Sequence, residues 1–515
     1  MIFDYLVVGA GAAGCVVASR LSEDPDVSVC LLEAGGRDTN PLIHIPAGVC
    51  AMVPTAINNW QFSTVPQSGL NGRIGYQPRG KTLGGSTSIN AMAYHRGHPA
   101  DFDEWAALGN AGWGYQDVLP YFKRAEHNEN FTGEFHGQGG VLNVCNHRSP
   151  NLFAGTFVEA GLQAGFPRCD DQNGATMEGF GRFQVMQKDG QRCSAARAYL
   201  TPNLERRNLH IETRAQATRI LFEGKRAVGV EFVQHGVTRT VRARREVILS
   251  GGAFNSPQLL LLSGVGDAAH LQEHGIALVL DLPGVGKNLV DHIDFVVSYR
   301  IPNRALFGLS MPGLWDLAKA AWRYWRERTG MLTSNFAESG AFLKTAPELA
   351  RPDIELAQAI VMCDNHGRKL YFGHGNSVHA CLLHPKSVGR VTLASANPLM
   401  APLIDPAFLT HPDDIATLVK GVKILRRVMA MPAFHVFAPR PLLDDPMDTD
   451  IQIEHAIRER ADTLYHPVER CASRRRWAVT GAWHRKVAGR RCVDHACHCR
   501  LQHYGRHCDD RRKGL

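Results

Sequence analysis

The N-terminal segment of the chain alternates short apolar runs with glycine-rich and helix-favouring residues. Residues 4–8 are apolar and rich in β-favouring side chains, which is typical of a strand buried in a parallel sheet. Residues 15–21 predict a helix, and residues 27–32 predict a second strand that ends at Glu33. The order of strand, helix and strand predicts an α/β fold with a parallel sheet.

The turn between the first strand and the helix carries the pattern G-x-G-x-x-G at residues 9–14. Gly9 permits a tight turn, Gly11 lets the backbone approach a pyrophosphate, and Gly14 lets helix and strand pack closely. The helix N-terminus favours an anion, and Glu33 would accept hydrogen bonds from a ribose diol. The segment therefore predicts a dinucleotide site, and it does not by itself distinguish NAD from FAD.

The middle and later parts of the chain predict a hairpin and then a mixed region. Residues 216–222 and 227–232 are strand-like runs joined by a short polar turn. Between about residues 306 and 443, two helical stretches (315–328 and 414–429) mix with strands. This region also holds three candidate metal ligands whose spacing and context are poor, so no metal site is predicted: Asn365, His366 and His374.

Two long segments resemble the signatures of a known family. Residues 79–90 (RGKTLGGSTSIN) form a glycine- and hydroxyl-rich loop that continues into AMAY, and residues 252–266 (GAFNSPQLLLLSGVG) follow a strand at 246–249. Together with residues 282–289 (LPGVGKNL), they resemble the glucose–methanol–choline (GMC) oxidoreductases, a family of FAD-dependent alcohol oxidases and dehydrogenases. The similarity runs from residue 3 to residue 468, and it is nearest to the bacterial choline- and aliphatic-alcohol-dehydrogenase branch.

The resemblance implies a two-domain architecture. The first domain would be Rossmann-like and bind FAD, with a parallel sheet flanked by helices and a β-meander. The second would be a discontinuous α+β substrate domain with an antiparallel sheet. The implied boundaries assign residues 1–150, 200–300 and 444–468 to the first domain, and residues 151–199 and 301–443 to the second.

The resemblance also implies that FAD is held without a covalent bond. Some relatives attach the flavin to a histidine in the loop at 84–90, and Ile89 takes that place here. Ala217 matches the position on the adenine side. The residues expected to contact the cofactor are Gly9, Ala10, Gly11, Ala12, Ala13, Gly14, Glu33, Ala34, Arg79, Gly84, Gly85, Ser86, Asn90, Ala91, Met92, Ala93 and Ala217.

A histidine stands at the end of the similar region, in the run Tyr-His-Pro-Val at residues 465–468. In the family, a histidine at this place acts on the substrate hydroxyl beside the flavin, so His466 is the expected catalytic base. The implied reaction oxidises a primary alcohol, aliphatic or choline-like, to the aldehyde, with hydride transfer to flavin N5. An imidazole suits this role because its ordinary pKa lies near neutral pH. Branch resemblance favours a quinone or another non-oxygen electron acceptor.

Charge and cysteine content change character after residue 468. The chain has 57 Lys and Arg against 49 Asp and Glu, a formal net charge of +8. Residues 469–515 carry 13 basic and 4 acidic residues, which leaves the rest of the chain near neutral at −1. That balance removes the support for nucleic-acid binding by the whole protein. Scattered cysteines and the absence of an apolar leader predict a cytoplasmic protein, and peripheral association with the inner membrane stays open, as does oligomeric state.

Residues 469–515 show no apolar period and none of the expected C-terminal family pattern. Read one base later, codons compatible with residues 479–500 encode LRVHGIAKLRVADASIMPAIVG, and those for 502–515 encode NTMAAIVMIAEKG, the apolar helix with the family ending. An out-of-frame translation is therefore predicted, with a second catalytic residue, an asparagine, in the codons now read as Gln502 and His503. The alternatives are a zinc-binding tail, whose ligand spacing fits no structural site, and a basic cysteine-rich interaction module. As written, the chain could also be a flavin-binding protein with impaired catalysis.

Overall fold

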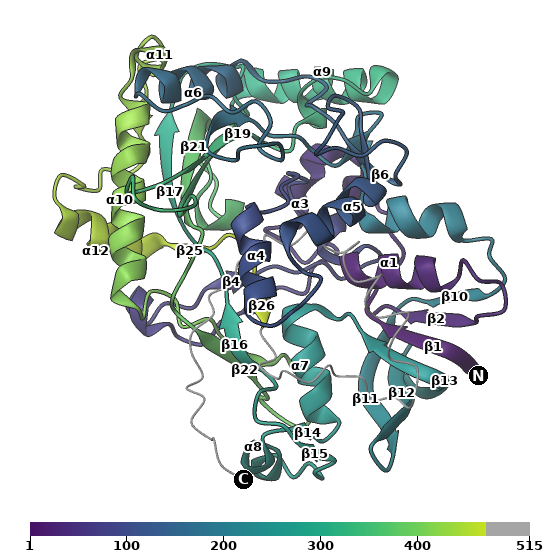
Figure 1. The fold of residues 1–515 in the computed structure, drawn as a ribbon. Coiled ribbons are helices and arrows are strands. Elements are labelled where there is room, and N and C mark those ends of the chain that lie inside the picture. The colour runs from purple at the N-terminus through teal and green to yellow at the C-terminus, as the bar shows by residue number, and fades with distance from the viewer. Residues whose placement is uncertain (470–515) are drawn as a thin grey trace.

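The computed structural model describes residues 1–469, in which two large sheets and their helices account for most of the chain (Figure 1). Six strands form the first sheet in the order β10-β2-β1-β13-β12-β11. The strands β10, β2, β1 and β13 run parallel, and β13, β12 and β11 form an antiparallel meander. The bounds are β1 (Ile2–Val8), β2 (Val29–Leu32), β10 (Leu209–Glu212), β11 (Ala215–Glu223), β12 (Arg226–Gln234) and β13 (Val237–Leu249), with helix α1 (Ala12–Leu21) after β1.

The second sheet is antiparallel, with seven strands that include the run β19-β20-β21-β17-β24. One of its faces packs on α6 and α10 in an apolar core that includes Phe295, Leu356 and Ala380. Figure 1 shows these helices beside the sheet, far from the N-terminus. The bounds are β17 (Ile293–Arg300), β19 (Ala337–Leu343), β20 (Ile354–Ala359), β21 (Gly373–Leu382), β24 (Arg440–Pro441), α6 (Leu152–Gln163), α9 (Met311–Glu327), α10 (Pro412–Met429), α11 (Pro432–His435) and α12 (Asp450–Arg460).

Side chains alternate along each strand, so a second set of residues lies on the opposite face of the sheet, and many of them are polar or small. Phe342 and Ala357 lie on this face and pack in one cluster with Phe183 and Ala93. Ala93 belongs to the segment that follows the glycine-rich loop of the first domain. This face of the second sheet therefore covers that segment, and the two halves of the chain meet there.

A third sheet joins the two halves, in the order β23-β22-β16-β26. Its strands are β16 (Lys287–Val290), β22 (Gly389–Thr392), β23 (Leu403–Asp405) and β26 (Val468–Glu469). The short strand β25 (Asp462–Thr463) pairs with β17, and β26 pairs with β16, both antiparallel. The chain from 462 to 469 is thus fastened at both ends to one continuous stretch, residues 289–294.

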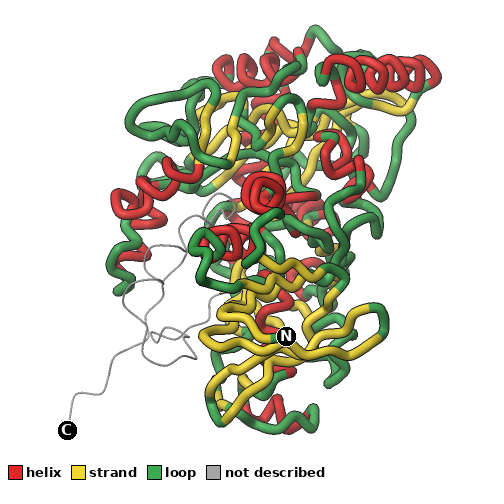
Figure 2. Tube along the Cα trace, turned by 90° about the vertical axis from the view of Figure 1, so that its right-hand side faces the viewer, coloured by secondary structure: helices red, strands yellow, loops and turns green. Residues whose placement is uncertain are grey.

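Smaller elements complete the described chain, and Figure 2 shows the strands near the N-terminus gathered at one end of the molecule. The remaining helices are α2 (Pro41–His44), α3 (Val49–Met52), α4 (Pro99–Ala107), α5 (Tyr115–Ala125), α7 (Gly252–Leu262) and α8 (Ala268–Glu273). The remaining strands are β3 (Phe62–Ser63), β4 (Tyr76–Gln77), β5 (Glu126–Asn128), β6 (Leu142–Val144), β7 (Gly179–Arg182), β8 (Gln187–Lys188), β9 (Gln191–Arg192), β14 (Val265–Gly266), β15 (Leu280–Asp281) and β18 (Gly308–Leu309).

The fold class predicted from the sequence is confirmed, with a parallel sheet that continues into a meander and a separate antiparallel sheet. The predicted hairpin is β11 and β12, and the predicted helices are α1, α9 and α10, with ends that differ by a few residues. Strand β17 lies in the second sheet, although the implied boundaries give residues up to 300 to the first domain; those boundaries stay a prediction. None of the helices in residues 1–469 is long and apolar enough to cross a membrane.

Candidate active site

The glycine turn after β1 has the close contacts that its three glycines predict. Gly9 has φ +97°, and a Cβ there would lie 2.6 Å from the Ser250 carbonyl oxygen. A Cβ on Gly14 would overlap the carbonyl oxygen of Gly9, which keeps α1 close to β1. By contrast, a Cβ on Gly11 would meet nothing nearer than 3.9 Å, so the backbone there is open to an approaching group.

Helix α1 offers its N-terminus to an anion. Its N-cap is Gly11, which supplies no side-chain cap, and its first turn, which includes Ala12 and Ala13, holds no acidic residue. The first N–H groups of a helix lack intrahelical partners and carry the positive end of the macrodipole. An open glycine backbone at an uncapped helix start fits the pyrophosphate of a dinucleotide.

Glu33 is buried at the end of β2 and points back toward the glycine turn. Its carboxylate accepts hydrogen bonds from the backbone N–H of Ala10 at 2.9 Å and of Gly35 at 2.8 Å. Burial raises the pKa of Glu33 to about 7, while these two N–H groups and the charge of Lys81 oppose the shift. The Glu33 carbonyl accepts from the N–H of Ala215 at 2.8 Å, which brings the start of β11 beside it. Ala34 follows Glu33 directly, and Ala217 is the third residue of β11; their contacts with the cofactor stay a prediction.

The loop that begins at Arg79 lies against the glycine turn. The N–H of Gly84 donates to the carbonyl of Ala10 at 2.8 Å, and a Cβ on Gly85 would lie 2.7 Å from the Cα of Gly11. Both glycines have positive φ, at +86° and +52°, so the loop can make this close approach without strain. Ser86 accepts from the N–H of Gly80 at 3.2 Å, which closes the loop on itself.

Arg192 and Asn335 hold the far end of this loop, and sequence reasoning missed both. The buried guanidinium of Arg192 donates to the backbone carbonyl of Asn90 at 2.7 Å and to its side-chain oxygen at 2.8 Å. Burial lowers the pKa of Arg192 to about 9. Asn335 donates to the carbonyl of Ala91, and the carbonyl of Met92 accepts from Met186 at 2.9 Å. These contacts come from distant segments, so no local pattern could have indicated them.

Ile89, where some relatives carry the flavin-linking histidine, is turned into an apolar cluster. It is buried with Ile43 and Met52, and Leu42 packs beside them. An aliphatic side chain in this cluster offers no nucleophile to a cofactor.

Asp291 is the residue that fastens the candidate base. Its buried carboxylate accepts from the backbone N–H of His466 at 3.0 Å, the hydroxyl of Thr463 at 2.6 Å and the side-chain amide of Gln77 at 3.3 Å. Burial raises the pKa of Asp291 to about 6, and the charge of Arg79 opposes that shift. Sequence reasoning missed Asp291, although it lies two residues after the family-like segment at 282–289.

Arg79 lies on the catalytic side of the loop. Its guanidinium stands over the Phe254 ring at 5.0 Å and donates to Gln77 at 3.0 Å. Burial lowers the pKa of Arg79 to about 10, and the carboxylate of Asp291 works against that change. The expected cofactor loop and the expected catalytic segment are linked through Gln77, which accepts from Arg79 and donates to Asp291 at 3.3 Å.

The residues around His466 determine the course of the backbone between β25 and β26. Tyr465 has φ +72°, a left-handed conformation that is costly for a non-glycine residue and concentrates at functional sites. Its hydroxyl shares a 2.7 Å hydrogen bond with His366, whose other nitrogen lies 3.0 Å from Asp462. The ring of His292 meets the ring of His466 edge-on, with centroids 5.4 Å apart.

The polar face of the second sheet carries a charged pair near this segment. His379 and Asp294 share a 2.6 Å hydrogen bond, and although burial opposes it, Asp294 raises the pKa of His379 to about 10. Ser377 on the same strand donates to the carbonyl of Val361 at 2.9 Å. The charge of Asp294 also acts on Tyr465, so the pair lies on the side of the catalytic segment.

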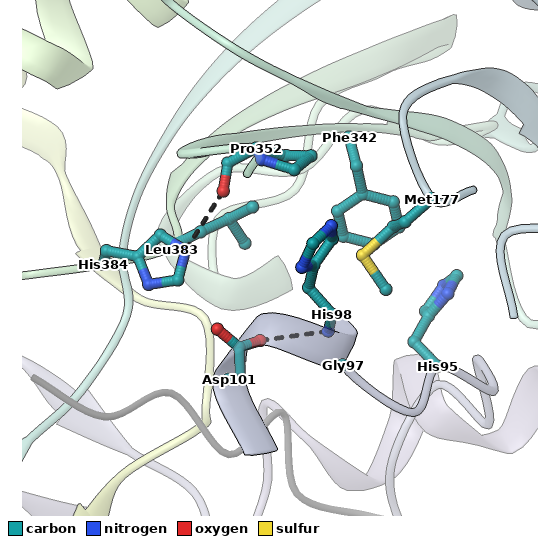
Figure 3. A pocket seen from close by; sticks show the side chains of 9 residues that line it. All are labelled: His95, Gly97, His98, Asp101, Met177, Phe342, Pro352, Leu383 and His384. Atoms are coloured by element: carbon teal, nitrogen blue, oxygen red, sulfur yellow. Dashed lines mark hydrogen bonds between the residues drawn. The ribbon is translucent and has the colours of Figure 1, made fainter. Parts of the chain in front are cut away.

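A separate small cavity lies beyond the loop, between α4 and the second sheet (Figure 3). His98, Phe342 and His384 line it, and the N–H of His98 donates to Asp101 at 3.0 Å. Burial lowers the pKa of His384 to about 3. None of the expected cofactor residues lines this cavity, and within residues 1–469 no group of three or more His, Cys, Asp or Glu is arranged to hold a metal ion.

Comparison with known proteins agrees with this geometry. Residues 3–294 and 385–479 match two models of the GMC oxidoreductase family. The chain is 47% identical over 474 residues to alcohol dehydrogenase [acceptor] of Pseudomonas putida, covering 91% of this chain and 86% of that protein. It is 41% identical over 470 residues to oxygen-dependent choline dehydrogenase of Sinorhizobium medicae, covering 91% and 85%.

Solved structures share the fold. Pyridoxine 4-oxidase from Mesorbium loti superposes with a TM-score of 0.79 at 29% identity, covering 90% of this chain and 88% of that one. A variant of formate oxidase from Aspergillus oryzae gives 0.83 at 26% identity, with the same coverage. These comparisons do not support a catalytically impaired protein, and the predicted change of frame lies outside the described residues. The chain belongs to the GMC oxidoreductase family and is an oxidoreductase that uses FAD.

Proposed function

We propose that the protein oxidises a primary alcohol to the aldehyde and delivers the electrons to a quinone or another acceptor that is not oxygen. The observation that carries this proposal is the placement of His466. Its segment is fastened to β16 and β17 and tied to Asp291, which Gln77 links to Arg79 of the cofactor loop. The similarity to an alcohol dehydrogenase [acceptor] supports the reaction class and the acceptor.

The residues that would hold FAD follow from the contacts described above. Gly11 and the start of α1 would receive the pyrophosphate, and Glu33 the ribose. Gly84, Gly85 and the segment up to Ala93 would lie along the flavin, without a covalent bond because Ile89 is buried elsewhere. Bound there, the flavin supplies the electrophile that accepts the hydride from the alcohol carbon.

The chain's own contribution to the reaction is the handling of the hydroxyl proton. The imidazole of His466 takes this proton as the hydride leaves the adjacent carbon. The backbone bond to Asp291 and the left-handed turn at Tyr465 fix the direction of the imidazole. A misplacement of about 1 Å can cost about a hundredfold in rate, so such fastening matters.

The carboxylates near Tyr465 favour a neutral aliphatic alcohol over a quaternary ammonium substrate. Asp291 is bonded by three donors, Asp462 lies beside His366, and Asp294 is paired with the cationic His379. A choline-like cation is best held by an aromatic face or an unpaired carboxylate. Each of these three acids already has a partner, so their arrangement supports an uncharged chain on the substrate.

A single assay distinguishes the candidates. Purified protein is given a series of primary alkanols or choline, with either a quinone analogue or dissolved oxygen as acceptor, and aldehyde is measured. We expect alkanols with the quinone analogue to give the higher kcat/KM. Faster turnover of choline would overturn the substrate assignment. Equal rates with oxygen and with the quinone analogue would overturn the assignment of the acceptor. The test is sharp because one relative is named as oxygen-dependent.

A further inference from the structure

Helix α9 is bound to the rest of the protein by a small part of its surface. It has 17 residues, of which only Gly313 and Tyr324 are buried. The 18-residue helix α10, by contrast, buries nine residues against the second sheet. In Figure 1, α9 lies along the outer edge of the second half of the molecule.

The exposed surface of α9 is apolar on one side. At about 100° per residue, the side chains that share this side turn toward solvent together. Trp325 is 75% exposed, Trp315 64% and Trp322 56%, although tryptophan is usually well covered. The members of this apolar face are Met311, Leu314, Trp315, Ala318, Ala321, Trp322 and Trp325.

Basic side chains border the apolar face. Lys319 stands over the ring of Trp315 at 5.5 Å and Arg326 over Trp322 at 5.4 Å, and Arg323 projects from the same flank. The two acids of the helix lie on the side away from the tryptophans. Both are paired with arginines: Asp316 with Arg304 and Glu327 with Arg323.

The apolar face continues beyond the helix. Leu309, in the strand β18 that precedes α9, forms a bridge with Phe372, and β18 pairs with β21 of the second sheet. Phe372 is 70% exposed, and Leu370, two residues earlier in the chain, is 73% exposed. Arg300 donates to the carbonyl of Phe372 at 2.7 Å, so a cation borders this part as well.

We propose that this surface, α9 with Leu309, Leu370 and Phe372, docks the enzyme on a bilayer that contains anionic phospholipid. An amphipathic helix with tryptophan and leucine on one face and lysine or arginine beside it lies in the membrane interface plane. The basic flank complements the negative surface of such a bilayer. A second copy of the chain fits poorly, because two facing helices would bring Lys319, Arg323 and Arg326 against their own copies. The inference goes beyond the proposed function and does not depend on the substrate.

Vesicle binding by the full-length protein tests this assignment. Sedimentation is compared with phosphatidylcholine vesicles alone and with vesicles containing about a third phosphatidylglycerol. We expect binding to the anionic vesicles that weakens with salt, and a blue shift of tryptophan emission. Two triple variants are compared with the wild type. The first combines Trp315→Ser, Trp322→Ser and Trp325→Ser, and the second combines Lys319→Glu, Arg323→Glu and Arg326→Glu. Each should weaken binding by about tenfold or more.

The matched control is Ile451→Glu on α12, an apolar side chain that is 81% exposed on another helix, and it should bind as the wild type does. Oxidation of a water-soluble alcohol with a soluble acceptor should be unchanged in every variant, because none of these side chains lies in the candidate active site. The proposal would be overturned if wild-type protein did not bind anionic vesicles. It would also be overturned if the triple variants bound as well as the wild type. The proposal would also be overturned if the wild type formed a dimer in solution and the tryptophan variant did not. A second copy of the chain would then cover this surface.

Discussion

Asp291 accepts the backbone N–H of His466 at 3.0 Å, although the two residues lie 175 positions apart in the chain. The same carboxylate holds the Thr463 hydroxyl, so both ends of a short segment are tied to one buried group. This bond goes to the backbone of His466 and not to its imidazole. Asp291 therefore holds the backbone of the segment that carries the candidate base.

Replacing His466 by alanine should lower kcat for alcohol oxidation by about 10²–10⁴-fold, the usual contribution of a positioned base. The visible spectrum of bound FAD should be unchanged, because His466 is not among the residues expected to hold the cofactor. His455→Ala, an exposed histidine on α12, serves as the control and should keep full activity. Steady-state rates with an artificial acceptor check this, and an active His466→Ala enzyme would contradict the assignment.

Asp291→Ala should reduce kcat by about 10–10² because His466 loses the acceptor that holds its backbone. Asp291→Asn keeps an oxygen that can accept one of the hydrogen bonds, so it should recover a large part of that loss. Equal rates for the alanine and asparagine variants would show that Asp291 does not act through this hydrogen bond.

Asp291 should also make folding stability depend on pH. Its folded pKa of about 6 exceeds the ordinary value of 3.8, so the folded state binds the proton more tightly. This group therefore favours folding at low pH, and the contribution is lost as the pH rises to 6 and above, amounting to about 2 kcal/mol between about pH 4.5 and 7. Urea unfolding at these two pH values measures the change in the free energy of unfolding. That change should differ between wild type and Asp291→Asn by this amount. No difference between the two proteins would mean that the carboxyl is not buried as described.

Glu33→Ala should weaken FAD binding by about 10–10²-fold. The variant removes the carboxyl group expected to bind the ribose and leaves the N–H groups of Ala10 and Gly35 without their acceptor, and a buried donor left unpaired costs about 1–3 kcal/mol. Glu33→Gln should lose less, because one oxygen remains. Titration of apoprotein with FAD, followed by flavin fluorescence, measures the change. The control is Glu23→Gln, which changes an exposed side chain just after α1. It should bind FAD as the wild type does.

Denatured protein should release its flavin. The apolar cluster around Ile89 offers no group that could bond covalently to the cofactor. After acid precipitation, FAD should appear in the supernatant with the mass of the dinucleotide. Flavin that stays with the pellet would contradict the non-covalent assignment.

Local sequence determined the parts of this protein whose physics is local. Gly14 could be assigned because a Cβ there would meet the Gly9 carbonyl of the same βαβ unit, and Gly9 because the tight turn after β1 needs its φ of +97°. The contact of Gly9 with Ser250, far along the chain, was not visible in the local sequence. The strand and helix periods likewise predicted β1, β2, α1 and the β11–β12 hairpin. For the catalytic segment, the residues around His466 indicated a role only through their resemblance to a family.

Only the tertiary structure decided which distant groups share a site. Asp291, Arg192 and the His379–Asp294 pair act through partners that lie far away along the chain, and no period or spacing encodes such a meeting. The same holds for α9. Its sequence predicted a helix, but whether its apolar face is covered depends on what packs there, and two buried residues out of 17 is a property of the assembled fold. Burial and partnership are set by the whole chain at once, so they become visible only when every element is in place.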